Sequence, residues 1–250
     1  MSSERQLLEE NNRWWGEHVH RYREALKYIN SHDVVLDIAC GTGFGTDIIA
    51  SHTSGKVTGG DIDQQAIDDC RKTWKKENVS FEAVDGTRIP YAAGHFDIVT
   101  SFETIEHTTQ YVEMVAEFAR ILKPTGRLIL STPNSRITSP DGVIHNPYHT
   151  QEFKYEELKD ILSVSFSKVE LYGQRYCRYD AGSVRGSISK VTEKIFLGFG
   201  VRKLPLSWRS GFMKRLFGYP LYSRETDFTL ESNLERIKEE CPVLYAVCQK

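Results

Sequence analysis

Long apolar runs are missing from this chain of 250 residues. No stretch of 18 consecutive apolar residues occurs, so the sequence contains no segment expected to span a membrane. The N-terminal residues, MSSERQLLEENNRWW, lack the apolar core of a signal peptide. The five cysteines are scattered and form no C-x-x-C pair, which argues against a disulfide framework or a zinc site. We therefore expect a soluble, cytoplasmic protein.

Net charge is also low, at −2, which argues against nucleic-acid or membrane binding by the protein as a whole. That balance hides an asymmetry. The segment 174–217 contains ten Lys/Arg and two acidic residues, net +8, so the remainder of the chain carries about −10. Any attraction to anions is therefore expected to come from this segment.

Short apolar runs alternate with amphipathic stretches through the first two thirds of the chain. A first helix is predicted over residues 5–29, and later ones over 63–76 and 110–122. The predicted strands cover residues 34–39, 56–61, 79–84, 96–101 and 127–132. Strands separated by helices indicate right-handed crossovers and a parallel sheet covered on both faces.

The end of the chain departs from this alternation. The runs FSKVELYG (166–173) and PVLYAVCQ (242–249) predict two strands without a simple crossover between them, hence a closing antiparallel pair. We predict an α/β fold with a Rossmann-like, seven-stranded mixed sheet whose last strand is antiparallel. The core would comprise residues 1–173 and 242–250, and residues 174–241 would form a basic, aromatic-rich helical insertion.

The stretch VVLDIACGTGFGT suggests a nucleotide-binding turn between the first strand and its helix. In the dinucleotide pattern G-x-G-x-x-G, the third glycine allows close packing of helix on strand. Gly41 and Gly43 match this pattern, but Thr46 stands at the third position, which lowers the odds of NAD. Asp61 ends the next strand and could hold the ribose hydroxyls of NAD or of another adenosine-containing cofactor. Its presence therefore does not distinguish between them.

Two other acidic residues distinguish a cofactor with phosphates from one without. Asp37 comes just before the glycines, where a pyrophosphate would pass, and two anions do not share a helix N-terminus cheaply. S-adenosylmethionine has no phosphate and carries a sulfonium and an ammonium cation, which suit carboxylates. Asp85 follows the third strand, where it could accept from an adenine amino group. Acids at the ends of three successive strands thus predict an adenosine pocket without a phosphate site.

At this point the sequence resembles the class I S-adenosylmethionine-dependent methyltransferases. The segments LDIACGTGFGT, GGDID, VDGTRIPYAAGHFDIVTSFETIEH and RILKPTGRLILSTPN are similar to the successive motifs of that family. The resemblance implies contacts to the methionine part from the loop of Asp37, Ala39, Gly41 and Gly43. It also implies contacts to the adenosine part from Asp61, Ile62, Asp85 and Gly86.

One further cofactor residue is suggested upstream of the sheet. The segment EHVHRY resembles one found in relatives, which makes Arg21 a candidate for binding the cofactor carboxylate. The alternative is an ordinary charge on a helix surface.

The methyl acceptor is expected beyond the fourth strand, which ends in TSFETIEHTT. The Asn/Asp-Pro-Pro-aromatic turn of many enzymes that methylate amino groups is absent, as is the Pro-Cys of cytosine C5 enzymes. These absences disfavour a base, DNA or glutamine target, so a hydroxyl on a small molecule is the leading class, and we expect it on a sugar or a lipid-linked glycan intermediate. Its methylation needs a base, and His107 and His149 stand after the fourth and fifth strands.

The same segment suggests a metal. ETIEH resembles the E-x-x-E-H pattern of ubiquinone-biosynthesis O-methyltransferases, which implies a divalent ion such as Mg²⁺ on Glu103, Glu106 and His107. A catalytic histidine without metal and a purely structural role remain open. An aromatic O-methyltransferase is accordingly the alternative function. A non-catalytic S-adenosylmethionine-binding module is the alternative from another class.

Two further segments bear on the acceptor. HNPYHTQEFKYEELKDIL resembles methyltransferases of surface-glycan pathways and predicts a flap followed by a helix from Lys154, with His149 beside Tyr148 suited to a sugar ring. The basic insertion allows three interpretations: a lid, a phosphate-attracting wall, or a surface on anionic lipid through residues 188–217, at the inner membrane face. The lipid surface would insert Trp208, Phe212 and Phe217.

Overall fold

The computed structural model describes residues 15–177 and 223–250. Of these, residues 21–175 and 230–250 belong to one compact unit, and residues 15–20, 176–177 and 223–229 to a second. Within the second unit the ring of Phe228 lies 5.4 Å from that of Tyr176. The candidate site described below lies in the first unit. The segment 188–217, predicted as a lid or lipid surface, lies outside the described residues, as do residues 5–14 of the predicted first helix.

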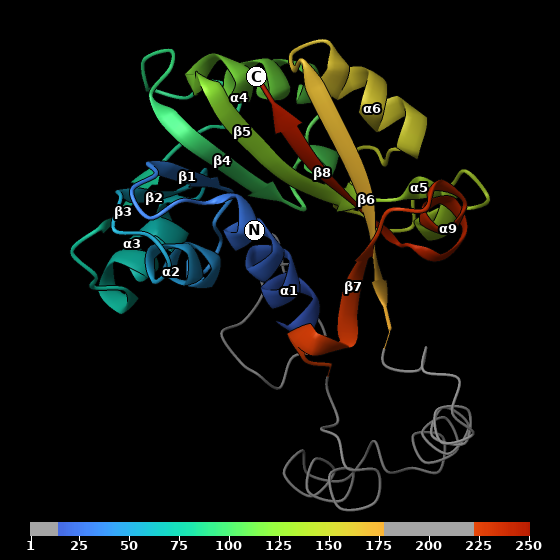
Figure 1. Cartoon of the computed structure of the whole chain (residues 1–250), viewed down its shortest axis with the longest axis horizontal. Helices are drawn as coiled ribbons and strands as arrows, with labels where there is room; N and C mark the ends of the chain where they lie inside the picture. Colours follow the sequence, from blue (N-terminus) through green and yellow to red (C-terminus); the bar gives the residue numbers. More distant parts are fainter. Residues whose placement is uncertain (1–14, 178–222) are drawn as a thin grey trace, which may run out of the picture. The chain divides into compact units, whose positions relative to one another are not determined.

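The described strands form one mixed sheet. They are β1 Val35–Ile38, β2 Val57–Asp61, β3 Val79–Ala83, β4 Phe96–Phe102, β5 Leu122–Pro133, β6 Lys168–Tyr176, β7 Phe228–Glu231 and β8 Val243–Gln249. Their order is β3-β2-β1-β4-β5-β8-β6-β7 (Figure 1). Parallel pairing joins β3 to β2, β2 to β1, β1 to β4 and β4 to β5. The last strand, β8, is antiparallel to both β5 and β6.

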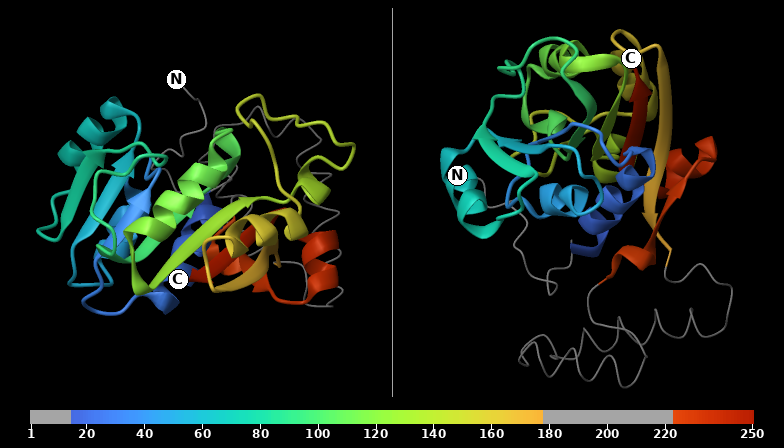
Figure 2. Two further views of the ribbon diagram at one scale, coloured as in Figure 1. Left: turned by 90° about the horizontal axis from the view of Figure 1, so that it is seen from above. Right: turned by 60° about the vertical axis from the view of Figure 1, so that its left-hand side comes forward.

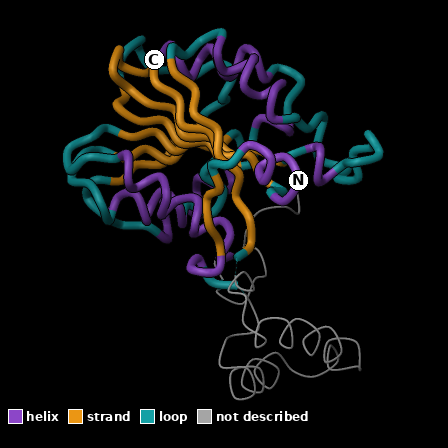
Figure 3. Tube along the Cα trace, turned by 45° about the vertical axis from the view of Figure 1, so that its right-hand side comes forward, coloured by secondary structure: helices purple, strands orange, loops and turns teal. Residues whose placement is uncertain are grey.

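The predicted α/β class, the Rossmann-like sheet and its antiparallel last strand are confirmed, but the strand count of seven is wrong. The sheet has eight strands, and Figure 3 shows them as one twisted surface. The additional strand is β7, which lies inside the segment predicted to be a helical insertion. It was missed because β6 continues to Tyr176 and offers its edge to the run FTLE, whose alternation covers only four residues and is too short to stand out alone.

The described α-helices are α1 Trp15–Ala25, α2 Phe44–Ala50, α3 Gln64–Thr73, α4 Tyr111–Ile121, α5 Ser135–Thr138, α6 Tyr155–Ser163 and α9 Leu234–Glu240. A 3-10 turn, η2 Ile105–His107, follows β4. Capping explains two of the starts. Asp63 accepts a hydrogen bond from the backbone N–H of Gln65 at the start of α3, and the Glu157 carboxylate accepts from the N–H of Lys154 before α6.

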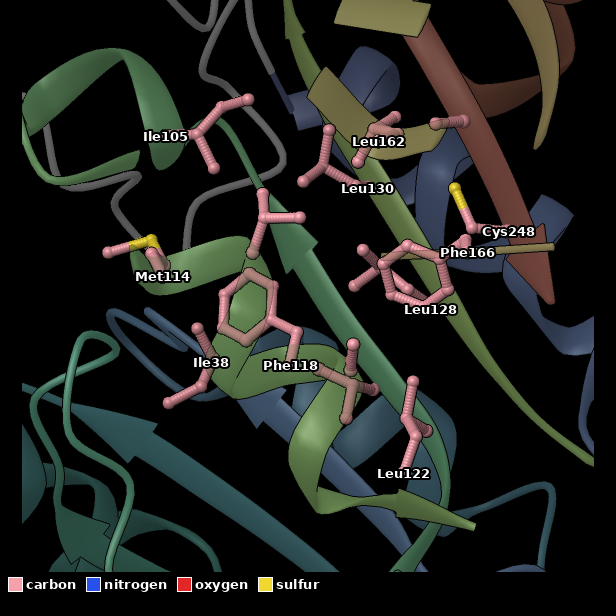
Figure 4. Close-up of a cluster of buried hydrophobic side chains, with 14 of the residues drawn as sticks. Ile38, Ile105, Met114, Phe118, Leu122, Leu128, Leu130, Leu162, Phe166 and Cys248 are labelled. Atoms are coloured by element: carbon pink, nitrogen blue, oxygen red, sulfur yellow. The ribbon is translucent and has the colours of Figure 1, made fainter. Parts of the chain in front are cut away.

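Helices cover both faces of the parallel strands. Figure 1 shows α2 and α3 on one face and α4 and α6 on the other, and Figure 2 shows the latter pair from above. The face under α4 and α6 holds the main apolar core (Figure 4). There Phe118 of α4 and Leu162 of α6 join Leu128 of β5 and Cys248 of β8, all fully buried. This burial fixes the positions of the strand ends that carry the polar residues described next.

Candidate active site

The loop between β1 and α2 is built on left-handed backbone. Ala39, Gly41 and Gly43 have φ values of 58°, 54° and 77°. A side chain on Gly43 would come within 2.8 Å of Nε1 of Trp74, so glycine is required there for both backbone and packing. At Gly41 an added Cβ would meet nothing within 4 Å. The loop therefore exposes its backbone at Gly41, where a ligand can approach closely.

Asp37 holds this loop from inside. Its carboxylate is fully buried and accepts hydrogen bonds from Thr46 and Thr100 (2.7 Å each) and from Tyr22 (3.2 Å). Burial raises its pKa to about 6, although the three hydroxyl donors oppose the shift. Asp37 thus ties α1, α2 and β4 to the loop. A direct contact from Asp37 to a methionine group remains a prediction.

Asp61 and Ile62, at the end of β2, present a carboxylate beside an apolar surface. The two oxygens of Asp61 accept from the backbone N–H groups of Gly41 and Asp63, at 2.9 Å each. A carboxylate oxygen can accept more than one hydrogen bond, and two such oxygens match the spacing of two vicinal hydroxyls. The side chain of Ile62 is 74% exposed, which leaves an apolar face available to a planar ring.

Asp85 and Gly86 follow β3. Oδ1 of Asp85 accepts from both the N–H (2.8 Å) and the hydroxyl (2.7 Å) of Thr87. This turn fixes an exposed carboxylate whose Oδ2 has no hydrogen bond among the described residues. Gly86 packs against Met114, where an added Cβ would lie 3.0 Å from the flexible Met114 methyl group.

Two hydroxyls of this edge are buried without a hydrogen-bond partner among the described residues: Oγ1 of Thr42, in the loop, and Oγ of Ser101, in β4. Buried hydroxyls are normally hydrogen-bonded, and a ligand at this edge is one partner that both could take. With the carboxylates of Asp61 and Asp85, which accept hydrogen bonds, they form a polar set suited to an adenosine with a cationic side chain. The residues present therefore fit S-adenosylmethionine.

Arg21 and Glu103 form a buried network at the end of β4. Nε of Arg21 donates to Gln174 (2.7 Å), and its guanidinium lies 3.5 Å from Oε1 of Glu103. The same oxygen accepts from Ser131 at 2.8 Å. Glu103 has φ of 52°, a costly conformation for a residue with a Cβ. The structure thus pairs Arg21, predicted to bind the cofactor, with Glu103, predicted to bind a metal. A contact between Arg21 and the cofactor stays a prediction.

The predicted catalytic histidines lie side by side. The ring centroids of His107 and His149 are 5.0 Å apart. One ligand atom from each of Glu106, His107 and His149 lies within 4.8 Å of the others. We call these three residues the histidine cluster. It brings the end of β4 and the predicted flap together, whereas His145 is exposed and lies 3.3 Å from Asp141.

Each histidine is oriented through Nδ1. In His107 this atom lies 3.0 Å from the carbonyl oxygen of Tyr148, and in His149 it lies 2.8 Å from Oε1 of Glu152. Since both partners are acceptors, Nδ1 carries the proton in each neutral ring and Nε2 carries the lone pair. Nε2 of His149 accepts from the amide of Asn146 at 2.9 Å.

The two acids of this region have opposite environments. Glu106 is fully buried, and burial together with the charge of Glu103 raises its pKa well above the usual value. Its Oε2 accepts from Thr132 at 2.9 Å. Burial also opposes ionisation of Glu152, but hydrogen bonds from Thr138, His149 and Ser139 outweigh it and lower the pKa.

The flap is anchored by backbone contacts that the sequence did not suggest. The carbonyl oxygen of Glu106 accepts from the N–H (2.7 Å) and the hydroxyl (3.0 Å) of Thr150. Sequence reasoning also missed Glu152, Thr132 and Gln174. Only Glu152 left a signal, because a carboxylate three residues after His149 is a natural partner for it.

The predicted magnesium set of Glu103, Glu106 and His107 is not the set that the structure assembles. Glu103 is engaged by Ser131 and Arg21, and His149 takes its place beside Glu106 and His107. Two imidazole nitrogens and one carboxylate suit Mg²⁺ poorly, because this ion prefers oxygen ligands in octahedral geometry. The residues present therefore do not fit magnesium.

Among the described residues, no helix has both the length and the apolar character needed to cross a membrane.

Comparisons with known proteins concern the domain and the fold of the chain. The family model "Methyltransferase domain" matches residues 36–130. A probable S-adenosylmethionine-dependent methyltransferase of Mycolicibacterium smegmatis is 32% identical over 65% of this chain and 62% of its own length. A ubiquinone biosynthesis O-methyltransferase of Coxiella burnetii is 32% identical over 40% of this chain and 43% of its own length. The chain thus spans less than two thirds of the length of these curated relatives.

Solved structures extend the likeness over nearly the whole fold. A S-adenosylmethionine-dependent methyltransferase from Archaeoglobus fulgidus is 18% identical, with a TM-score of 0.61 and 94% of each chain covered. The cyclase SpnF is 16% identical, with a TM-score of 0.59, and the match covers 97% of this chain and 85% of SpnF. At such identities these likenesses concern the fold alone. Residues 36–130 thus match a methyltransferase domain, and the fold of the chain is that of solved S-adenosylmethionine-dependent methyltransferases.

Proposed function

We propose that this protein transfers a methyl group from S-adenosylmethionine to a hydroxyl oxygen of a small molecule. The observation that carries the proposal is the juxtaposition, at one sheet edge, of the adenosine-type carboxylates with the histidine cluster. When bound, S-adenosylmethionine supplies an electrophilic methyl group on its sulfonium. The residues that would hold it are the loop at Gly41, the carboxylates of Asp61 and Asp85, and the apolar face of Ile62.

The acceptor hydroxyl has to lose its proton as the new carbon–oxygen bond forms. In this proposal the proton passes to Nε2 of His107, since Nδ1 is held as a donor by the Tyr148 carbonyl. His149, predicted as a second base, has both ring nitrogens engaged, by Glu152 and Asn146. Its role in the proposal is to position the flap beside His107.

A sugar or lipid-linked glycan hydroxyl is the acceptor class that we propose. Tyr148 supports it, because its 40% exposed ring lies in the same flap as His149 and can stack on the C–H face of a sugar. An aromatic hydroxyl is the second candidate, favoured by the E-x-x-E-H pattern and by the likeness to a ubiquinone biosynthesis O-methyltransferase. An acceptor screen with nucleotide sugars, glycolipids and catechols, read by mass spectrometry, separates the two.

The cofactor part of the proposal is tested by melting. S-adenosylhomocysteine at a hundred times its dissociation constant is expected to raise the melting temperature by about 5 °C or more, corresponding to roughly 2.7 kcal/mol. NAD at equal concentration is expected to have no effect, since a phosphate would face acids. The reverse pattern would overturn the assignment.

The variant Asp61→Asn sharpens this test. Removing the charge weakens hydrogen bonds of about 1.5–3 kcal/mol, so S-adenosylhomocysteine affinity is expected to fall roughly ten- to hundredfold. Asp69→Asn, an exposed carboxylate of α3, serves as the matched control and should bind normally. Equal affinities in both variants, measured by calorimetry, would contradict the proposed pocket.

Fold membership does not by itself establish methyl transfer, as the likeness to a cyclase illustrates. A non-catalytic module that binds S-adenosylmethionine is therefore the competing class. Methylated product from any acceptor in the screen eliminates this alternative. Cofactor binding without product across the whole screen would favour it.

A further inference from the structure

The histidine cluster has the arrangement of a metal-binding site. Glu106 and His107 come from the 3-10 turn after β4, and His149 comes from the flap 42 residues after His107. Their ligand atoms nevertheless lie within 4.8 Å of one another. A cation between such atoms would be within reach of bonds of about 2.0–2.2 Å after small side-chain adjustments.

The surroundings of both histidines support this interpretation. Metal-binding histidines usually donate their second N–H to a carbonyl or carboxylate, which orients the ring. Here Nδ1 of His107 faces the Tyr148 carbonyl and Nδ1 of His149 faces Glu152. The two Nε2 atoms are thereby the coordinating atoms, and at His149 a cation would displace the Asn146 amide.

Glu106 provides an independent observation. Its side chain is fully buried, and Oε1 has no hydrogen-bond partner among the described residues. This oxygen lies 3.9 Å from Nε2 of His107. A polar oxygen without a hydrogen bond at such a depth is costly, and a bound cation would compensate it.

We propose that Glu106, His107 and His149 bind one divalent cation of the zinc and cobalt class. Two imidazole nitrogens and one carboxylate oxygen are ligands that these ions favour and that magnesium does not. Three protein ligands leave a position open, which is typical of zinc sites that also bind a small molecule. The ion replaces the Asn146 amide as the partner of Nε2 of His149.

This inference concerns cation binding and does not depend on methyl transfer. Ligation uses the Nε2 lone pair that accepts the hydroxyl proton in the proposed function, so that His107 acts as a base only in the ion-free protein. The test below uses neither S-adenosylmethionine nor an acceptor. Failure of the cation site and failure of the proposed function are thus distinguishable.

The experiment is calorimetric titration of the chelator-treated full chain with ZnCl₂, CoCl₂ and MgCl₂. We expect one Zn²⁺ or Co²⁺ ion per chain and no Mg²⁺ binding at equal concentration. The absorption spectrum of the cobalt form should indicate nitrogen and oxygen ligands, without a sulfur charge-transfer band. Absence of zinc and cobalt binding, or a sulfur band, would overturn the proposal.

Variants locate the ion. Glu106→Gln and His149→Ala should each weaken binding on the order of a hundredfold or more, and Glu152→Gln, which only orients His149, about ten- to hundredfold. Glu103→Gln is the matched control, because the sequence pattern would make Glu103 a ligand and the structure does not. His145→Ala, an exposed histidine of the same flap, is the second control.

The controls should bind as the unmodified protein does. Unchanged binding in Glu106→Gln and His149→Ala, or loss of binding in Glu103→Gln, contradicts the proposed site. If a ligand variant unfolds, as judged by its metal-free melting curve, Glu152→Gln carries the test because it leaves all three ligands in place.

Discussion

The carboxyl group of Asp37 shows how much the role of a single residue depends on its depth. As an acid beside a glycine loop it was predicted to contact the cofactor, but in the structure it is enclosed by the hydroxyls of Tyr22, Thr46 and Thr100. Asp61 and Asp85 were predicted from the same kind of pattern, and only Asp85 is exposed. The sequence identified three acids at strand ends without indicating which one would lie beneath the loop.

The raised pKa of Asp37 predicts a pH dependence of stability. Its folded-state value is about 6, against 3.8 when unperturbed, so the unfolded chain ionises first as pH rises. The stability contributed by the protonated group is complete below pH 3.8 and is lost as pH rises through 6. At 1.36 kcal/mol per pKa unit, the loss amounts to about 3 kcal/mol.

The isosteric variant Asp37→Asn lacks this titration. The free energy of unfolding of the unmodified protein, relative to that of the variant, should therefore fall by about 3 kcal/mol between pH 3 and 7. Urea unfolding at several pH values measures the difference. If the difference in unfolding free energy between the two proteins stays constant over this range, folding does not change the pKa of Asp37.

At the scale of elements, the turn from β1 into α2 couples backbone conformation to helix packing. Gly43 caps α2 with φ of 77°, and the space beside it is filled by Trp74 and Cys70. The tryptophan also donates to the carbonyl oxygen of Thr42 at 2.9 Å. The segment after α3 thus holds the loop in the conformation that the predicted cofactor site requires.

A pair of alanine substitutions separates the two effects. Gly94→Ala places a Cβ at φ of 69° in open space, so it should cost only the left-handed strain, about 1–2 kcal/mol. Gly43→Ala adds a contact at 2.8 Å and is expected to cost a further 1–3 kcal/mol or so from overpacking. Chemical denaturation of both variants measures the difference. Equal losses would mean that Trp74 moves aside freely.

At the scale of the whole molecule, the parallel sheet brings distant segments to one edge. The carboxyl ends of β1, β2 and β4 are aligned by parallel pairing of Ile38 with Gly60 and with Ser101. A ligand bound at this edge contacts segments that are separated by tens of residues along the chain. Its effect on the backbone should therefore appear in several segments at once.

Hydrogen exchange measures this effect. On addition of S-adenosylhomocysteine, peptides covering residues 39–46, 61–65 and 85–88 should gain protection together, because their amides lie in or beside the proposed pocket. Peptides from the amino-terminal ends of the same strands serve as internal controls and should change little. Protection confined to one segment would indicate a different binding site.

The sequence by itself indicated five parallel strands, an antiparallel last strand and the motifs of a methyltransferase domain, because these depend on local periodicity and on patterns within short segments. It also placed His107 and His149 at the same sheet edge. Only the tertiary structure decided that Glu103 pairs with Arg21, that His149 joins Glu106 and His107, and that an eighth strand lies beside β6. These features arise from contacts between segments far apart in the chain. Burial and hydrogen bonding select which residues pair there, and they leave no local pattern in the sequence.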